Sequence, residues 1–293
     1  MASYAFTPTL WAKVFMAGLK KDLVAEPITN RDFTGGPVVP GAALQIWNPG
    51  TVSVGTYTKN TDVTSPLLEE PTDTEDTLNI NQNKYFSFYV DDLNRAQGAI
   101  DPQGPYTEEA VYAVRDVIDQ AVLAEYANAH ANNILYPAAA LSYSNVRDDI
   151  AALYTKLTNS KVPREGRFLI VSPRVEEAIN SYLASKNTGL TDVANANGYK
   201  GRFCGFEIYV SHNVPHTTNT AGTSGSAGSK HVDHCLAGHR SAIAMGYSIP
   251  TGSLETFRPE KRFGTGIKGL CCYGLKTIQS GIRLGVYKPW SDS

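Results

Sequence analysis

Strand-like hydrophobic runs form two stretches in the first third of the chain: 42–57, with runs at 42–47 and 52–57, and 84–90. In the second stretch, Phe86, Phe88 and Val90 fall on one face of an extended chain, and the residues between them fall on the other. A period of two is typical of a strand that is buried on one side. The pattern therefore predicts that the two stretches are the two sides of a long β-hairpin.

The segment that connects these stretches, residues 59–76, is long and acidic. It carries a single base, Lys59, and its acids are Asp62, Glu69, Glu70, Asp73, Glu75 and Asp76. Carboxylates are costly to bury without partners, so this excursion cannot easily be covered by its own domain. We therefore predict that the hairpin contacts another chain and that the protein is a building block of an assembly.

A helical period predicts an N-terminal helix over residues 7–24, with Thr7 as its cap and a broken apolar stripe. Two large side chains, Trp11 and Phe15, recur at helical spacing. A short terminal helix with this much apolar surface needs another surface to lie on. Glycines and prolines then predict coil over 25–41.

The longest helical pattern begins at Thr107, which can act as an N-cap, and runs to about Asn133. Glu108 and Glu109 lie in its first turn, where negative charge favours the helix dipole. Roughly 26 residues of helix would span about 39 Å. This length is unusual for a globular domain, and it predicts a structural spine.

Beyond residue 145, helix and strand patterns alternate. Apolar residues recur at helical spacing over 146–157, and 167–171 has the continuous apolar pattern of a buried strand. Ser172 followed by Pro173 is typical of a helix start, and 206–210 is the next strand pattern. The order predicts a small sheet with flanking helices.

The last third of the chain contains a low-complexity segment at 217–229 that predicts a surface loop. A strand pattern follows at 233–245. Two more patterns, 270–278 and 282–287, are separated by a short glycine-containing break and predict a late hairpin that returns to the spine helix.

Composition is that of a globular protein, with 42% hydrophobic and 18% charged residues in 293. The net charge of −2 gives no global field that would attract nucleic acid or an anionic membrane. The N-terminus lacks a signal-peptide pattern, and no apolar run approaches the length of a membrane span. We therefore expect a protein that is made and used without secretion.

Four cysteines occur without any C-x-x-C spacing, and we expect reduced thiols in a cytosolic setting: Cys204, Cys235, Cys271 and Cys272. The best candidate for a metal site is the segment 231–239, which contains three histidines and a cysteine. In a strand, however, His231 and His234 would face opposite sides, whereas zinc needs its ligands to converge. We predict no metal site.

Other motifs that could carry chemistry are weak. Residues 264–269 match G-x-G-x-x-G, but the residues after them have a strand pattern where a dinucleotide site needs a helix. The acid pairs 91–92 and 148–149 lie at a turn and in the first turn of a helix. We predict no catalytic residue, no cofactor and no enzymatic activity; an enzyme that uses 231–239 is the remaining alternative of that class.

The order of these elements resembles that of the HK97-fold major capsid proteins of tailed bacteriophages. Residues 84–96 look like the end of the extended loop of that family. Residues 163–173 look like the entry from strand to helix in its axial domain, and 205–215 look like the strand that follows. The resemblance covers nearly the whole chain.

The resemblance implies an α+β capsid fold in four parts. These are an N-terminal arm (1–40), an extended β-hairpin loop (41–92), a peripheral domain with the spine helix (93–140 and 251–293) and an α/β axial domain (141–250). The function it implies is self-assembly, as hexamers and pentamers, into an icosahedral shell that encloses double-stranded DNA. An encapsulin-like compartment shell with protein cargo is the alternative.

The resemblance also implies partners. The extended loop would lie over a neighbouring subunit, so the candidate inter-subunit residues are Lys59, Asp62, Glu69, Glu70, Asp73, Glu75, Asp76, Trp11 and Phe15. A basic patch that could receive the acidic loop is Lys156, Lys161, Arg164, Arg167 and Arg174. A separate scaffolding protein, a portal, non-specifically held DNA and a decoration protein are further expected partners, without a membrane. The expected location is the virion, with assembly in the host cytoplasm.

Overall fold

The computed structural model describes residues 21, 23–32, 41–60, 70–92, 103–186, 201–219, 230–248 and 254–292. Its helices are α1 (Ala25–Ile28), α3 (Gln103–Ala124), η1 (Glu125–Asn128), η2 (Ala131–Asn133), α4 (Val146–Asn159), α5 (Pro173–Ser185) and η3 (Gln279–Gly281). The strands before α5 are β1 (Ala43–Asn48), β2 (Thr74–Asn79), β3 (Gln82–Asp91), β4 (Ile134–Leu135) and β5 (Arg167–Val171). The later strands are β6 (Arg202–Phe203), β7 (Phe206–Val210), β8 (His216–Asn219), β9 (Lys230–Asp233), β10 (Cys235–His239), β11 (Ile243–Ser248), β12 (Leu254–Phe257), β13 (Gly264–Thr277), β14 (Leu284–Tyr287) and β15 (Trp290–Asp292).

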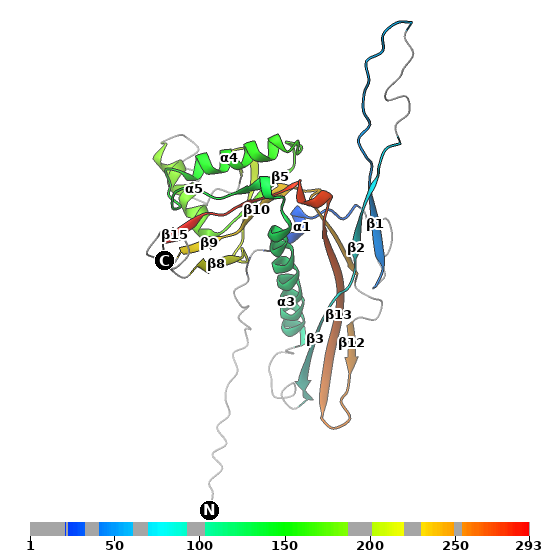
Figure 1. Ribbon diagram of the computed structural model, residues 1–293. Coiled ribbons are helices and arrows are strands. Elements are labelled where there is room, and N and C mark those ends of the chain that lie inside the picture. The colour runs from blue at the N-terminus through cyan, green and yellow to red at the C-terminus, as the bar shows by residue number, and fades with distance from the viewer. Residues whose placement is uncertain are drawn as a thin grey trace, which may run out of the picture.

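A six-stranded sheet has the order β4-β14-β10-β5-β7-β6 and lies in the same part of the molecule as α4 and α5 (Figure 1). Every residue of β5 is buried, and so is every residue of β14. Strands β5 and β7 pair in parallel, which requires a crossover connection, and α5 begins that crossover. Ser172 caps α5 by accepting a hydrogen bond from the Val175 amide, with Pro173 in the first turn. The predicted strand–helix–strand unit is therefore confirmed.

A second sheet is organised around β13, a strand of fourteen residues. β3 lies along one edge of β13, and β11 and β12 pair with the other. The side chains of β3 alternate as predicted, but its partner differs: 84–90 does not return along 42–57. The register of β3 is set by β13, which lies about 180 residues later, so the local pattern could not reveal it.

The strand that does return along β1 is β2, with a register from Ala43↔Asn79 to Asn48↔Thr74. The strand predicted at 52–57 is wrong, because residues 49–58 form no strand and 51–60 are all exposed. Figure 1 shows the β1–β2 hairpin projecting beyond the rest of the molecule. A small apolar cluster at its root, separate from the main core, consists of Ile46, Leu78, Ala244 and Ile278.

The predicted late hairpin is also wrong, because β13 and β14 lie in different sheets. The connection between them turns through η3, where Gln279, Ser280 and Gly281 all have positive φ. A Cβ on Gly281 would lie 2.0 Å from the carbonyl oxygen of Asn128, so only glycine fits this turn. The chain thus leaves one sheet and enters the other at this point.

The spine helix α3 packs against β3 and runs beside the second sheet (Figure 1). It starts at Gln103, four residues before the predicted cap at Thr107, and Pro105 lies in its first turn, where a missing N–H costs little. It ends at Ala124, because the chain tightens there into the 3₁₀ turn η1. The predicted length is therefore too long at the C-terminal end.

Two further expectations differ from the structure. The short helix α1 lies at 25–28, within the stretch predicted as coil. Of the helix predicted over 7–24, residues 7–20 and 22 lie outside the described residues, and the helix is wrong at Lys21, Leu23 and Val24, which are not helical. The strand pattern at 233–245 is divided among β9, β10 and β11, of which β9 joins β8 and β15 in a three-stranded sheet. The predicted loop 217–229 begins with β8, and 220–229 lie outside the described residues.

The main core joins the face of α3 that carries Val122 and Leu123 to α4 and the six-stranded sheet. Leu153 and Leu157 of α4 are fully buried in it, as is Phe206 of β7. Among the described helices, none combines the length and apolarity that a membrane span requires. The projecting hairpin therefore lies outside the main core and contributes only to the small cluster at its root.

Candidate assembly surfaces

The projecting hairpin exposes large apolar side chains that no other part of the described chain covers. Trp47 is 63% exposed, Val52 67%, Val54 96% and Tyr57 69%. An exposed apolar patch of this kind marks an interaction site more often than a free surface. The hairpin thus has the surface of a buried element, without a partner among the described residues of its own chain.

The predicted charged contacts of this hairpin fall into two groups. Lys59, Glu70, Asp73 and Glu75 are exposed, in line with a surface role. Asp76 is half-buried and is used inside the chain, as described below. The other predicted contact residues, Asp62, Glu69, Trp11 and Phe15, lie outside the described residues.

Asp76 fixes the root of the hairpin. Its Oδ2 accepts a hydrogen bond from Asn48 Nδ2 at 2.8 Å and another from the Gln279 amide at 2.8 Å. One carboxylate therefore ties both strands of the hairpin to the turn that connects the two sheets. Further out, Asp73 Oδ1 accepts from the Gly50 amide at 3.0 Å, which keeps the strands together where the ladder ends.

The predicted basic patch is only partly at the surface. Lys161, Arg164 and Arg174 are exposed, and Lys156 is half-buried. Arg167, in contrast, is 1% exposed, so its assignment to the patch is wrong. Its polar character alone suggested a surface position.

The buried Arg167 is bonded to neutral oxygens. Its Nε donates to the Pro163 carbonyl at 2.8 Å, and its Nη2 donates to the Val162 carbonyl at 2.7 Å. The guanidinium also lies 4.4 Å from the centroid of the Tyr154 ring. Burial lowers the pKa of Arg167 from its ordinary value, and the carbonyl dipoles and the ring compensate for the lost hydration.

A second basic surface lies at the turn between β12 and β13, which is at the opposite end of the molecule from the hairpin tip in Figure 1. Lys261, Arg262 and Phe263 are exposed there, and Phe263 is 85% exposed. Arg258 pairs with Asp92 across the sheet. The sequence predicted no role for this turn, although a signal was present in the cluster of cations beside an aromatic residue at 258–263.

The histidines at 231–239 serve structural roles. His231 Nε2 lies 2.9 Å from Asp233 Oδ1, and Asp233 Oδ2 accepts from Ser172 Oγ at 2.7 Å. In the described part of the chain, no group of three or more His, Cys, Asp or Glu residues is placed to hold a metal ion. All four cysteines are free thiols, and burial raises the pKa of Cys235.

His234 has the strongest electrostatic perturbation among these histidines. Its ring stacks on Tyr126 with a centroid distance of 4.3 Å and an angle of 6°, and its side chain is almost fully buried. Burial, together with the positive charge of Lys288, lowers the pKa of His234 to about 4. A neutral imidazole in this position packs one sheet against the end of the spine helix, and it is not placed for acid–base chemistry.

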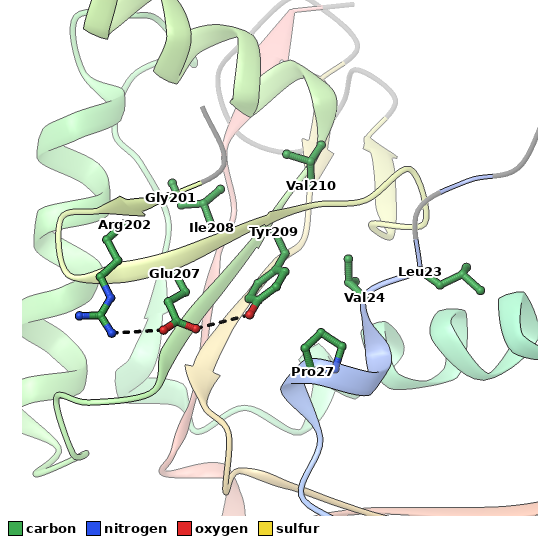
Figure 2. Close-up of a pocket in the computed structure, with 9 residues that line it drawn as sticks. All are labelled: Leu23, Val24, Pro27, Gly201, Arg202, Glu207, Ile208, Tyr209 and Val210. Atoms are coloured by element: carbon green, nitrogen blue, oxygen red, sulfur yellow. Dashed lines mark hydrogen bonds and ion pairs between the residues drawn. The ribbon is translucent and has the colours of Figure 1, made fainter. Parts of the chain in front are cut away.

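A shallow hollow lies between α1 and the edge of the six-stranded sheet, where Leu23, Val24 and Pro27 face the strand that carries Tyr209 (Figure 2). Glu207 bonds to Arg202 at 3.3 Å there. Partial burial raises the pKa of Glu207, but hydrogen bonds from arginines, among them Arg240 at 2.8 Å, outweigh this and leave its pKa below the ordinary value. The acid is an ion-pair partner at a junction of elements.

Comparison with known proteins relates this chain to a family of phage proteins. A family model described as phage capsid protein matches residues 74–288, which is more than half of the chain. No curated protein matches the sequence.

Solved structures of phage proteins share the fold. One from Mycobacterium phage Che8 has a TM-score of 0.76 at 23% identity, with 98% of each chain covered. The capsid of Ralstonia phage GP4 has a TM-score of 0.76 at 14% identity, with 100% of this chain and 99% of that chain covered. The capsid structure of cyanophage P-SCSP1u has a TM-score of 0.68 at 16% identity, with 99% and 94% covered. The predicted HK97-like capsid fold is thereby confirmed.

Proposed function

This chain belongs to the phage capsid protein family, and from that premise we propose how its surfaces build the shell. It is a major capsid protein, a structural component of the virion that assembles with copies of itself. We propose that it forms hexamers and pentamers of an icosahedral shell around double-stranded DNA. The phage family and structures give no support to the compartment alternative with protein cargo.

The observation that carries this proposal is the projecting hairpin. Its apolar side chains at 47–57 are exposed in the single chain, and Asp76 ties its root to the rest of the fold through two hydrogen bonds. An apolar arm that also carries exposed acids suits an element that lies over a neighbouring subunit, where burial supplies affinity and charge supplies register. We propose that the exposed acids Glu70, Asp73 and Glu75 take part in this contact.

Charge complementarity favours the basic turn at 258–263 as one surface that the acidic hairpin meets on a neighbouring subunit. The turn presents Lys261 and Arg262 beside the exposed ring of Phe263. The exposed residues of the other basic patch, Lys161, Arg164 and Arg174, form the second candidate surface.

We propose that the chain divides into an arm, an extended loop, a peripheral domain and an axial domain, with boundaries adjusted to the sheets. The extended loop then comprises β1, β2 and the residues between them. The peripheral domain contains α3 with β3, β11, β12 and β13, since these strands share one sheet. The axial domain contains α4, α5 and the six-stranded sheet, including the late strand β14.

The remaining partners are proposed from the family and from charge. With a net charge of −2, the shell would hold DNA without sequence preference and without a strong grip. A separate scaffolding protein and a portal would act during assembly in the host cytoplasm, and a decoration protein is a further candidate. We propose that the protein has no enzymatic activity, since the described candidates for chemistry, such as His231 and Glu207, are engaged in structural bonds.

The first test is negative-stain electron microscopy of the purified protein, alone and with a co-expressed scaffolding protein. The expected result is closed shells, with nuclease-protected DNA in particles from infected cells. Small discrete particles in both samples would contradict the shell. Protein cargo in place of DNA would favour the compartment alternative.

A second test isolates the hairpin. Residues 51–72 are replaced by a short glycine-rich turn, which leaves the β1–β2 ladder up to Asn48↔Thr74 intact. We expect a folded chain that forms no shells, whereas shortening the low-complexity loop 220–229 should leave assembly unchanged. Shells of normal size from the hairpin variant would remove the role assigned to it.

A charge swap tests the proposed register. Glu70→Lys with Glu75→Lys should block assembly, as should Lys261→Glu with Arg262→Glu, and combining all four changes should restore it. The matched alternative combines the hairpin changes with Lys161→Glu and Arg164→Glu. Rescue by the second combination alone would move the contact to that patch.

A further inference from the structure

A hollow of about 550 Å³ separates the spine helix from the second sheet. One wall is a single face of α3, formed by Val111, Val114 and Ile118 at helical spacing. The opposite wall is apolar as well, with Phe86, Met245 and Leu270. We propose that this hollow is the docking site of the N-terminal segment of the same chain, residues 10–20.

The direction in which the chain enters the described structure carries the proposal. Asp119, a fully buried residue of α3, accepts hydrogen bonds on Oδ1 from the amides of Val24 at 2.7 Å and Ala25 at 2.8 Å. Four residues earlier, the Lys21 amide donates to the Tyr112 hydroxyl at 2.6 Å. From residue 25 back to residue 21 the chain thus moves from position 119 to position 112 of α3.

The seven positions from 119 to 112 correspond to about 10 Å of the α3 axis, and position 112 is the one nearer the N-terminus of the helix. Two side-chain contacts fix Lys21 at this position. Its Nζ lies 3.6 Å from Asp116 Oδ2 and 3.0 Å from Asn213 Oδ1. Asn213 in turn donates from Nδ2 to Asp119 Oδ2 at 2.9 Å. The described chain therefore begins at Lys21 beside α3, at the side that carries Tyr112 and Asp116.

The next surface on that course is a second hollow, which adjoins the first. Leu23, Val111 and Arg115 line both, and Thr107 and Glu108 line the second. Leu23 therefore already occupies the boundary between the two hollows. The surface that adjoins Leu23 there is apolar and open, since Val111 is 40% exposed.

The sequence of the preceding segment matches this surface. Phe15 and Leu19 are four positions apart, so the helical pattern of the sequence puts these two on one face, and Leu23 beyond them is apolar as well. Lys20 is in the same segment, and the second hollow offers Glu108 as a complementary charge. The tether at Lys21 gives this segment a high effective concentration at the hollow, which a segment of another copy lacks.

The direct test is proximity cross-linking in the full chain. In a Cys271→Ser background, Leu19→Cys is combined with Val111→Cys and treated with a short bifunctional maleimide. The matched control combines Leu19→Cys with Ala113→Cys, an exposed position on the other side of the same helix. We expect at least tenfold more intrachain product with residue 111, identified by peptide mass spectrometry.

Mixing two singly substituted chains, one with Leu19→Cys and one with Val111→Cys, tests the choice of occupant. Covalent dimers in place of intrachain product, in free protein or in shells, would overturn docking within one chain and assign the hollow to a second copy. Equal yields at positions 111 and 113 would overturn the docking site itself.

Limited proteolysis gives a second readout that needs no added cysteine. Trypsin cleavage at Lys13 should become about tenfold faster with Val111→Glu and stay unchanged with Ala113→Glu. Both positions are exposed, so both variants should fold, which circular dichroism verifies. An unchanged cleavage rate in a folded Val111→Glu variant would contradict the proposal.

Discussion

The strand β5 and the β1–β2 hairpin are both extended segments that contain large apolar side chains, but their surroundings are opposite. All five residues of β5 are buried, among them the charged Arg167. Of the hairpin strands, only Ile46 and Leu78 are buried, while Trp47 is exposed. In β5 the apolar surface is buried within this chain and stabilises its fold. In the hairpin much of the apolar surface stays exposed, where it is open to contacts with other chains.

The largest expected effect separates the two regions by stability. Phe206→Ala removes a fully buried ring that meets Tyr154 edge-on at 5.6 Å, and it should lower the free energy of unfolding by about 3 to 5 kcal/mol. Val54→Ala in the hairpin should change it by less than about 0.5 kcal/mol. Denaturant unfolding of the unassembled protein measures both; equal losses would break the comparison.

A smaller loss is expected from the buried charge in β5. Arg167→Met leaves the carbonyls of Val162 and Pro163 without their donors, which should cost about 2 to 4 kcal/mol. Arg164→Met, at a neighbouring exposed position, is the control and should be nearly neutral. A neutral Arg167→Met would mean that the apolar stem alone stabilises the site.

Acid should weaken the packing around His234. The folded chain holds the pKa of His234 at about 4, below its ordinary value of 6.5, so the unfolded chain binds the proton first as the pH falls. The stabilisation is complete above pH 6.5 and is lost between pH 6.5 and 4, by about 2 to 3 kcal/mol. Unfolding measured across this range should lose that dependence in His234→Gln and keep it in His212→Gln, which alters an exposed histidine.

The smallest change in stability is expected where the effect on assembly is greatest. Val54→Asp with Tyr57→Asp should leave the free energy of unfolding within about 0.5 kcal/mol, because both side chains are exposed in the single chain. Shell formation, followed by light scattering, should nevertheless be lost. Normal shells from this variant would mean that the exposed hairpin residues have no assembly role.

Local chemistry in the sequence was sufficient to predict individual elements. The buried strand β5, the Ser172 cap of α5 and the alternation in β3 are all properties of neighbouring residues. The pairing of strands is not such a property. β3 was assigned to the wrong partner because β13 is distant in sequence, and the late hairpin failed because three consecutive residues of positive φ redirect the chain.

The assembly surfaces divide in the same way. The acidic character of 59–76 was visible in the sequence, but the internal role of Asp76 depends on Gln279, which only the fold brings near. Arg167 was placed in a surface patch because charge alone does not reveal four carbonyl and hydroxyl acceptors. The turn at 258–263 was missed because its position at the opposite end of the molecule from the hairpin is a property of the fold, which the local sequence does not reveal.

The two hydrogen bonds that Asp76 accepts have a mechanical consequence. The carboxylate of Asp76 connects the base of the hairpin, at Asn48, to the turn at Gln279 where the chain passes from one sheet to the other. A load applied to the hairpin would therefore pass through this carboxylate to the turn at Gln279, where the chain leaves the second sheet for the six-stranded sheet. Asp76→Asn, which keeps the shape but weakens these hydrogen bonds, would loosen that linkage first.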